Sequence, residues 1–300
     1  MHEQLIKHLR TGDARALARA ISFVENEASG YDEILLSLRR DSSATVIGVT
    51  GPPGAGKSTI VDGMIGELLK EQGRIAVLCV DPSSPFNLGA VLGDRIRMSE
   101  WYTHPNVFIR SLATRGSVGG LSPKIIEVTD LLRSCGFDNI IVETVGVGQS
   151  EIEIAALADI TVVVLVPESG DEVQTMKAGL MEIADIFVIN KSDRPDADLF
   201  EKNLQLLLAP AFGKRSREVP VIRTIATEKK GIPELVHRIK NDVRPGVNEE
   251  RRIALLTEKA WQLMAKQRMR EVDKLELRRR VEKGLQNHNL NIYSLVADYK

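Results

Sequence analysis

Hydrophobic residues along the chain change period several times, and each change predicts a different element. From Met1 to Arg40 they recur at helical spacing with a break at Gly12 and Asp13, which predicts N-terminal helices. The stretch Ala44–Val49 is instead a short β-branched run, as expected of a strand buried on both faces. Further strands are expected at Ile75–Val80, Val107–Arg110, Asn139–Glu143, Thr161–Val166, Ile186–Asn190 and Val221–Thr224.

Helical patterns of roughly ten or more residues separate most of these strands. The first such pattern runs from Ser58 to Gln72 and stops at Gly73. Apolar strands that alternate with helices favour a mostly parallel sheet with helices on both faces. The sequence therefore predicts an α/β fold built on a doubly wound, mostly parallel sheet.

The pattern after Gly231 is helical again. A helix is expected to start at Gly231–Leu235, and Pro245 and Gly246 follow its end as breakers. The stretch Glu249–Gln286 then has the pattern of one long charged helix. Its apolar stripe consists of Leu255, Leu256, Trp261, Leu263, Met264, Met269, Val272, Leu275 and Leu277.

The C-terminal stripe has two interpretations. We favour an oligomerisation arm, because the stripe continues well past the residues that complete the α/β core. The alternative is a solvated helix that folds back on the domain. The expected organisation is an N-terminal helical segment (residues 1–42), an α/β domain (residues 43–245) and a C-terminal helical arm (residues 246–300).

Composition excludes several classes of protein. The 300 residues include 40 Lys and Arg against 41 Asp and Glu, and this balance gives no global attraction to nucleic acid or an anionic membrane. The aromatic content of 4% argues against proteins that bind single strands by base stacking. The longest apolar stretch, Ile160–Val166, is far too short to span a bilayer, and Met1–Arg10 has no apolar run for a signal peptide.

Cysteine usage points to a reducing environment. Cys79 and Cys135 are widely separated in apolar surroundings, which excludes a disulfide framework and favours two buried thiols. A reducing cytosol or organelle matrix fits this pattern, and we expect a cytoplasmic protein. From the composition we expect it to bind neither nucleic acid nor a membrane.

The segment Gly51–Ser58, GPPGAGKS, carries the strongest chemical signal. It fits G-x-x-x-x-G-K-[ST] and lies between the strand ending at Val49 and the helix starting near Ser58, which is the context that the motif needs. Its glycines let backbone N–H groups surround phosphate oxygens, and the helix N-terminus adds its positive dipole end. Lys57 is expected to reach the β- and γ-phosphates of a nucleotide, and the Ser58 hydroxyl to ligate Mg²⁺.

The segment Glu143–Gly146, ETVG, directly follows a predicted strand. A carboxylate at a strand end, followed three residues later by glycine, is the switch II pattern of GTPases, in which the acid holds the Mg²⁺ shell and the glycine N–H meets the γ-phosphate. The acid here is Glu rather than the usual Asp, and its longer side chain would contact Mg²⁺ through water or orient the attacking water. The alternative is a carboxylate that caps the following helix.

The segment Asn190–Asp193, NKSD, follows another strand and indicates the base. Asp193 can accept two hydrogen bonds from the N1–H and the exocyclic amine of guanine, whereas adenine offers no such pair. Losing such contacts costs on the order of several kcal/mol, which is roughly a thousandfold or more in selectivity. After the last strand, the Ala226 N–H is expected to meet guanine O6, although Ile225 stands where serine is usual.

Two more candidate metal-binding carboxylates lie between the glycine-rich loop and Glu143. Asp81 ends a predicted strand and Asp94 follows in LGDRIRM, where a helix N-cap is the alternative. A Mg²⁺–nucleotide site needs few protein carboxylates, because Mg²⁺ keeps waters and takes phosphate oxygens. Three acids around it would form a catalytic and switching network.

With these residues in place, the sequence resembles the MeaB/ArgK family of P-loop GTPases, which includes methylmalonic aciduria type A proteins. The resemblance covers nearly the whole chain, and its most specific part is Glu143–Glu151. The other segments that carry it are Arg15–Ile21, the Gly51–Ser58 loop, Val80–Ser84, Leu92–Met98, Ala113–Gly116 and Asn190–Asp193.

The resemblance implies a GTP-hydrolysing chaperone that gates adenosylcobalamin loading and protection of an acyl-CoA mutase, of the methylmalonyl-CoA mutase type. It implies a homodimer formed through the C-terminal extension and a switch III segment at Pro167–Lys177, which signals nucleotide state to the mutase. Phe86–Ala90 departs from the family pattern because it lacks the paired glycines common early in switch I.

The resemblance also implies the site residues, with Asp94 arriving from switch I. Lys57, Glu143 and Asp94 are the expected catalytic residues, and Mg²⁺ is expected among Ser58, Asp81, Asp94 and Glu143. The nucleotide, as GTP or GDP, is expected to contact Gly51, Gly54, Ala55, Gly56, Lys57, Ser58, Thr59, Gly146, Asn190, Lys191, Asp193 and Ala226.

Three other functions stay open at this point. Family members were long described as transport-system ATPases or kinases acting on amino-acid-binding proteins, but Asp193 argues against ATP. A nickel or cobalt insertion GTPase also carries Glu in switch II, but such proteins hold metal with Cys and His clusters, and here neither type has ligand spacing. A scaffold without turnover is disfavoured by the intact Lys57, Ser58 and Glu143.

Overall fold

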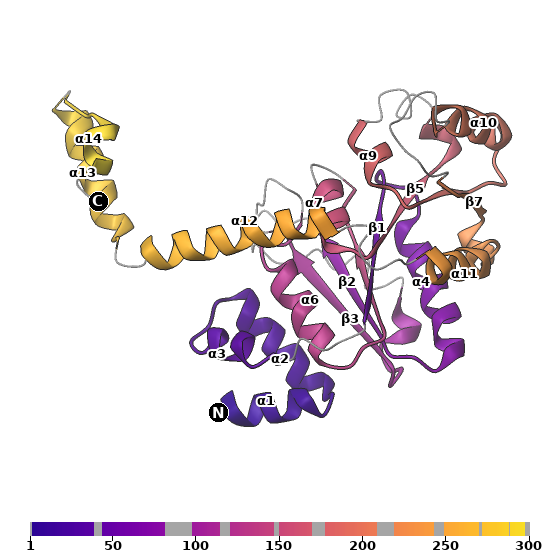
Figure 1. Cartoon of the computed structure of the whole chain (residues 1–300), viewed down its shortest axis with the longest axis horizontal. Helices are drawn as coiled ribbons and strands as arrows, with labels where there is room; N and C mark the ends of the chain where they lie inside the picture. The colour runs from indigo at the N-terminus through magenta and orange to yellow at the C-terminus, as the bar shows by residue number, and fades with distance from the viewer. Residues whose placement is uncertain are drawn as a thin grey trace. The chain divides into compact units, whose positions relative to one another are not determined.

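The computed structural model (Figure 1) describes residues 2–38, 44–81, 98–114, 121–146, 150–169, 178–208, 219–242, 249–269, 272–287 and 289–297. Within these residues the central element is a seven-stranded sheet in the order β3-β2-β4-β1-β5-β6-β7, and every neighbouring pair is parallel. All the expected strands are present, which confirms the doubly wound sheet. They are β1 (Thr45–Thr50), β2 (Ile75–Asp81), β3 (Val107–Ala113), β4 (Asn139–Glu143), β5 (Ile160–Leu165), β6 (Ile186–Asn190) and β7 (Val221–Thr224).

Helices precede, connect and follow the strands. The N-terminal ones are α1 (His2–Arg10), α2 (Ala14–Glu25) and α3 (Tyr31–Leu36). Those between the strands and after β7 are α4 (Lys57–Leu68), α6 (Ile125–Ser134), α7 (Ser150–Leu157), α9 (Ala178–Ile183), α10 (Ala197–Leu208) and α11 (Ile232–Asp242). Short 3₁₀ turns are η1 (Leu69–Glu71), η2 (Ser99–Trp101), η3 (Pro167–Ser169) and η5 (Ala226–Glu228).

Both faces of the sheet are covered by helices. On one face, Val49 of β1 belongs to a buried cluster with Met64 of α4 and Leu235 of α11. On the other face, Phe187 of β6 packs in a second buried cluster with Leu204 of α10. Because successive residues of a strand point to opposite faces, burial of both faces explains why these strands consist of continuous apolar runs.

Strand order determines where a ligand can bind. The chain leaves β1 for β2 on one side of the sheet and later returns past β1 to β5 on the other. Ligands of open α/β sheets bind outside the carboxyl ends of the strands, at the point where the strand order reverses. The carboxyl end of β1 lies between those of β4 and β5, and it is therefore the expected position of a site.

The N-terminal helices pack against the sheet domain through α2 and α6. Asp13 caps α2 by accepting a hydrogen bond from the Ala16 N–H at 2.6 Å. The guanidinium of Arg74, just before β2, donates to the Gly12 carbonyl at 3.3 Å and the Cys135 carbonyl at 2.8 Å, and lies 4.6 Å from the ring centre of Phe137. One arginine thus joins the α1–α2 turn to the entry of β4.

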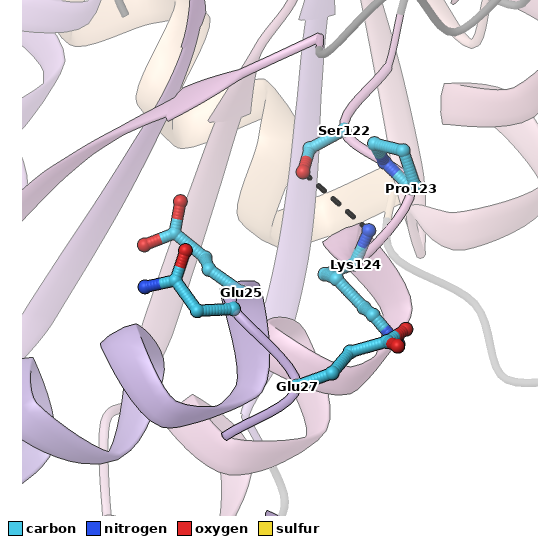
Figure 2. Close-up of a pocket in the computed structure, with 6 residues that line it drawn as sticks. Glu25, Glu27, Ser122, Pro123 and Lys124 are labelled. Atoms are coloured by element: carbon cyan, nitrogen blue, oxygen red, sulfur yellow. Dashed lines mark hydrogen bonds and ion pairs between the residues drawn. The ribbon is translucent and has the colours of Figure 1, made fainter. Parts of the chain in front are cut away.

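A cleft of about 280 Å³ lies between the end of α2 and the start of α6 (Figure 2). Lys124, which lines it, is paired with Glu27 at 2.9 Å and with Glu127 at 3.3 Å. Burial alone would lower the pKa of Lys124, but the hydrogen bond to Glu27 and the charge of Glu127 outweigh it, so the pKa is raised. The ammonium stays charged and holds the α2–α3 turn to α6. The lining residues are Glu25, Asn26, Glu27, Ser122, Pro123 and Lys124.

The edge strand β7 is only four residues long. Its Arg223 forms ion pairs with Asp198 at 2.6 Å and with Glu201, both on α10. The hydrogen bonds to these two carboxylates raise the pKa of Arg223. The charged side chain on this short strand therefore stays fixed beside α10.

The C-terminal stretch expected as one long helix is two helices, α12 (Glu249–Arg268) and α13 (Lys274–Gln286), followed by α14 (Ile292–Ala297). The single-helix prediction is wrong because Asp273 caps α13, accepting a hydrogen bond from the Leu275 N–H at 2.8 Å. A side chain that satisfies a backbone N–H in this way starts a new helix.

The chain forms two compact units, residues 1–252 and 253–300. The boundaries expected at residues 42 and 245 stay predictions, since both fall in stretches outside the described residues. In the part of the chain that the structure describes, no helix has the length and apolar character to cross a membrane. Both cysteines are buried, as predicted, and burial raises the pKa of the Cys135 thiol to about 11.

Gly48 in β1 provides a test of how tightly the sheet packs on α7. A Cβ there would lie 2.7 Å from Ile154 Cγ1 and 3.0 Å from Ala158 Cβ. We expect Gly48→Ala to lower the free energy of unfolding by about 1–3 kcal/mol, because overpacking a buried site forces its neighbours to shift. Urea unfolding measures the change.

The matched control is Gly66→Ala on α4, where the new Cβ would meet the Trp101 ring at an ordinary 3.5 Å. This substitution should raise the free energy of unfolding by about 0.5–1 kcal/mol, since alanine favours the helix. Equal effects at both positions would contradict the packing argument.

Candidate nucleotide site

The glycine-rich loop connects β1 to α4, and steric contacts explain two of its glycines. Gly51 has φ +137°, and a Cβ there would lie 2.0 Å from the Val164 carbonyl oxygen. Gly56 has φ +90°, and its Cβ would lie 2.3 Å from Asn190 Nδ2. Only glycine allows the loop to lie this close to β5 and β6. Gly54 differs, since a Cβ there would have no atom within 4 Å.

Lys57 and Ser58 open α4 and are both buried. The Lys57 ammonium donates to the carbonyl oxygens of Gly51 at 2.9 Å and Pro52 at 3.0 Å. The Ser58 hydroxyl donates to Glu143 Oε1 at 2.7 Å. The serine of the loop and the acid at the end of β4, which are 85 residues apart, are therefore in direct contact.

Asp81 is the last residue of β2, which pairs with β4 on the side away from β1, and it is 3% exposed. In the β2–β4 register Cys79 is opposite Glu143, so Asp81 lies on the same face two residues further toward the carboxyl edge. Carboxylate and hydroxyl oxygens are the donors that Mg²⁺ prefers. The described residues contain no group of three or more His, Cys, Asp or Glu side chains placed to hold a metal ion. Asp94 lies outside the described residues.

Gly146 lies directly against the loop. Its φ is +86°, and a Cβ there would lie 2.4 Å from the Gly51 carbonyl oxygen and 2.6 Å from Lys57 Nζ. The segment that leaves β4 therefore passes beside the lysine of the loop. A side chain at this position would push the two apart.

Asn190, at the end of β6, joins the glycine-rich loop to the segment after β7. Its Nδ2 donates to the Ala55 carbonyl at 2.8 Å, and its Oδ1 accepts from the Ala226 N–H and the Thr224 hydroxyl, both at 3.1 Å. Lys191 has φ +56°, and the Ser192 N–H donates to the Thr224 carbonyl at 3.1 Å. The buried amide thus holds three loops together.

The two predicted base contacts differ in what the structure shows. Asp193 is exposed, with the cation of Lys230 nearby; the pKa of Lys230 is raised chiefly by its hydrogen bond to Glu228 and further by the charge of Asp193. The Ala226 N–H already has Asn190 as a partner within the protein. Its contact with guanine O6 stays a prediction.

Two features of the site were not found from the sequence. The hydroxyls of Thr50 and Thr144, before the glycine-rich loop and after Glu143, are 2.9 Å apart and buried. Arg194, directly after Asp193, forms an ion pair with Glu168 in η3. A polar residue at the end of an apolar strand is the signal that Thr50 and Thr144 offered. Residues 170–177 of the expected switch III lie outside the described part.

The first strand of the parallel sheet leads through a glycine-rich loop into a helix that begins with Lys-Ser, and the NKSD segment is hydrogen-bonded to that loop. These features define a P-loop GTPase. Residues 17–278 match the family described as methylmalonyl Co-A mutase-associated GTPase MeaB. The chain belongs to the MeaB family and is a GTPase, which confirms the resemblance and the activity predicted from the sequence.

Two relatives named as GTPases and one named as a methylmalonic aciduria type A homolog are similar to this chain. A Pyrococcus abyssi protein is 50% identical over 244 residues, 80% of this chain and 75% of its own. GTPase ArgK of Escherichia coli is 37% identical over 246 residues, 78% of this chain and 73% of its own. The mitochondrial methylmalonic aciduria type A homolog of Caenorhabditis briggsae is 38% identical over 207 residues, 64% of this chain and 50% of its own.

Solved structures agree at the level of the fold. A protein described as an LAO/AO transport system kinase superposes with a TM-score of 0.70 at 27% identity, covering 99% of this chain and 95% of that one. The hydrogenase maturation factor HypB of Archaeoglobus fulgidus has a TM-score of 0.51 at 18% identity, covering 76% of this chain and 100% of its own. At this identity HypB shares the fold alone.

Asn190 allows a direct test of how the site is assembled. We expect Asn190→Ala to lower the free energy of unfolding by about 2–4 kcal/mol, because buried groups around Ala55, Thr224 and Ala226 lose their partner. GDP affinity should fall with it, because the three loops are no longer held together. Urea unfolding and calorimetric titration with GDP measure the two effects.

The control is Ser192→Ala, which removes only a partly buried hydroxyl bond to the Thr224 carbonyl. It should cost less than about 1 kcal/mol and leave GDP affinity unchanged. An Asn190→Ala protein as stable as this control would contradict the role of Asn190.

Proposed function

We propose that this GTPase uses its nucleotide cycle to gate adenosylcobalamin loading and protection of an acyl-CoA mutase of the methylmalonyl-CoA mutase type. Two findings support the proposal: the family description names a mutase-associated GTPase, and a relative is named as a methylmalonic aciduria type A homolog. The structural observation that best supports a nucleotide cycle is the buried hydrogen bond between Asn190 and the glycine-rich loop.

In this proposal Lys57 binds the β- and γ-phosphates, and Ser58, Glu143, Asp81 and Asp94 surround Mg²⁺. The buried side-chain oxygens of Ser58, at the start of α4, and of Glu143 and Asp81, at the ends of the neighbouring strands β4 and β2, support that assignment, because they match the ligand type of Mg²⁺. When bound, Mg²⁺ neutralises charge that develops on the phosphate oxygens. Glu143 holds its carboxylate beside Ser58, where it can orient a water toward the γ-phosphate.

Loop contacts are proposed from the same residues. Gly51, Gly54, Ala55 and Gly56 direct N–H groups at phosphate oxygens, and Thr59 extends this contact in the first turn of α4. The Gly146 N–H meets the γ-phosphate, which its position beside Lys57 Nζ supports. The guanine base lies against the Asn190–Asp193 loop, with Lys191 along the ring, Asp193 on the N1 edge and the Ala226 N–H at O6.

Signalling to the mutase is assigned to Pro167–Lys177. The ion pair between Glu168 of this segment and Arg194, directly after Asp193, supports a link between guanine binding and that segment. Charges that pair differently in two nucleotide states form a two-state element of the kind that coupling requires. Asp171 and Lys177, which lie outside the described residues, carry further charges in it.

Homodimerisation is proposed through the C-terminal arm. In residues 253–300 large apolar side chains are exposed, which supports an interface that a second copy covers. The most exposed of them are Ile253, Trp261, Met269, Leu275, Leu285, Ile292, Tyr293 and Val296. We also propose that the protein acts in the cytoplasm.

The base preference separates this function from a transport-system kinase, the description carried by one structural neighbour. We expect GTP and GDP to bind at least about a hundredfold more tightly than ATP and ADP, because Asp193 pairs with two guanine donors. Calorimetric titration measures the affinities. Asp193→Asn should remove most of the preference, since the amide replaces an acceptor oxygen with a donor, and comparable affinities for ATP and GTP in the unaltered protein would reject the base assignment.

Partner dependence tests the mutase role. We expect slow turnover of GTP by the protein alone and an increase on the order of 10–10³-fold with its adenosylcobalamin-dependent mutase, because no Gln directly follows Gly146 to position water. Phosphate release measures the rate. Lys57→Ala should abolish turnover in both conditions, whereas Asp171→Ala and Lys177→Ala should keep GTP affinity and lose the stimulation. Turnover that is equally fast without the mutase counts against the proposal.

A further inference from the structure

Two buried hydrogen bonds connect both ends of the glycine-rich loop to consecutive residues at the end of β4. Thr50, directly before Gly51, has its hydroxyl 2.9 Å from that of Thr144. Ser58, directly after Lys57, donates to Glu143 at 2.7 Å. The loop that holds phosphate is thus closed at its base by residues 143 and 144, which we call the base clamp.

The two bonds of the base clamp lie on opposite faces of the sheet. Glu143 is two residues after Ile141 and so lies on the same face of the sheet. Ile141 packs in the buried cluster with α4, the helix that carries Ser58. Thr50 is two residues after Gly48 and shares its face of the sheet, and Gly48 faces Ile154 and Ala158 on the α7 side. Since neighbouring residues alternate between faces, Thr144 lies on the side of Thr50. The Thr144 N–H also donates to the Val49 carbonyl at 3.0 Å.

Burial makes the threonine bond sensitive to substitution. Thr50 is 0% and Thr144 2% exposed, so water does not readily replace either hydroxyl. Leaving one buried hydroxyl without its partner costs more than removing both with side chains of the same shape. Valine has the shape of threonine, and serine keeps the hydroxyl, so the chain offers variants that separate packing from hydrogen bonding.

Thr144 is two residues from Gly146, where an added Cβ would lie 2.4 Å from the Gly51 carbonyl oxygen and 2.6 Å from Lys57 Nζ. Because only Val145 separates Thr144 from Gly146, holding Thr144 in place limits how far the Gly146 N–H can move relative to the glycine-rich loop. We propose that Thr50 and Thr144 are positioning residues that couple the phosphate loop to Gly146, so that this N–H meets the γ-phosphate without rearrangement. The inference rests on the proposed role of Gly146.

A merely structural role would have different consequences. If the hydroxyl pair only satisfied its own burial, loss of both hydroxyls would change stability and leave nucleotide discrimination unchanged. If the pair positions Gly146, loss should leave GDP binding intact, because GDP has no γ-phosphate. The binding of a GTP analogue and the rate of hydrolysis should fall together.

The experiment compares the double variants Thr50→Val/Thr144→Val and Thr50→Ser/Thr144→Ser in the full chain. Titration calorimetry with GDP and with a non-hydrolysable GTP analogue gives the affinity ratio, phosphate release gives kcat and KM, and thermal unfolding reports the fold. We expect the valine pair to keep GDP affinity within about twofold and to lose about tenfold in both the ratio and kcat, since small misplacements cost up to about a hundredfold. The serine pair should match the unaltered protein in all of them.

A valine pair that unfolds normally and keeps the ratio and kcat overturns the inference. Should this pair fail to fold, Thr50→Ala/Thr144→Ala decides in the same assays, because it removes both hydroxyls, adds no methyl group in their place and leaves neither hydroxyl without its partner. An unchanged ratio and kcat there overturn the inference as well. Failure of the proposed function is distinct, since the unaltered protein itself would then fail to discriminate GTP analogue from GDP or would show no mutase-dependent turnover.

Discussion

The side chain of one buried amide, Asn190, determines how the nucleotide site is assembled. It donates to the glycine-rich loop at Ala55 and accepts from the segment after β7 at Thr224 and Ala226. Ala55 lies in the loop after β1, whereas Thr224 and Ala226 lie at and just after the end of β7, far from Ala55 in sequence. Because each bond is buried, its loss leaves polar groups that water does not reach. Asn190 therefore holds the glycine-rich loop and the segment after β7 in their relative position.

The sheet was predictable because its signals are local. A strand buried on both faces shows itself as an apolar run, and glycines at the turn into α4 are required by close approach of neighbouring strands, as at Gly51. The division of the C-terminal helix was missed, because its apolar stripe continues across Asp273 and conceals the cap. Helical periodicity indicates which face of a helix is apolar, but it does not indicate where one helix ends and the next begins.

Two contacts of the site could not be predicted from the sequence, because each joins residues that are far apart along the chain. Thr50 and Thr144 are 94 residues apart, and only the β1–β4 register brings their hydroxyls together. The ion pair of Glu168 with Arg194 likewise depends on β5 and β6 being neighbours. Motifs identify residues that touch a ligand, whereas residues that connect motifs become visible only when strand order is known. Their residue types, threonine and a surface ion pair, are common at loops.

The short edge strand β7 has a consequence for how the protein meets other chains. An exposed strand edge offers unpaired backbone groups on which a strand of another molecule can add. Here the edge is four residues long, and Arg223 is held by Asp198 and Glu201 of α10. Charged side chains on short edges oppose such pairing. On this side the described sheet is thus protected against growth into an intermolecular sheet.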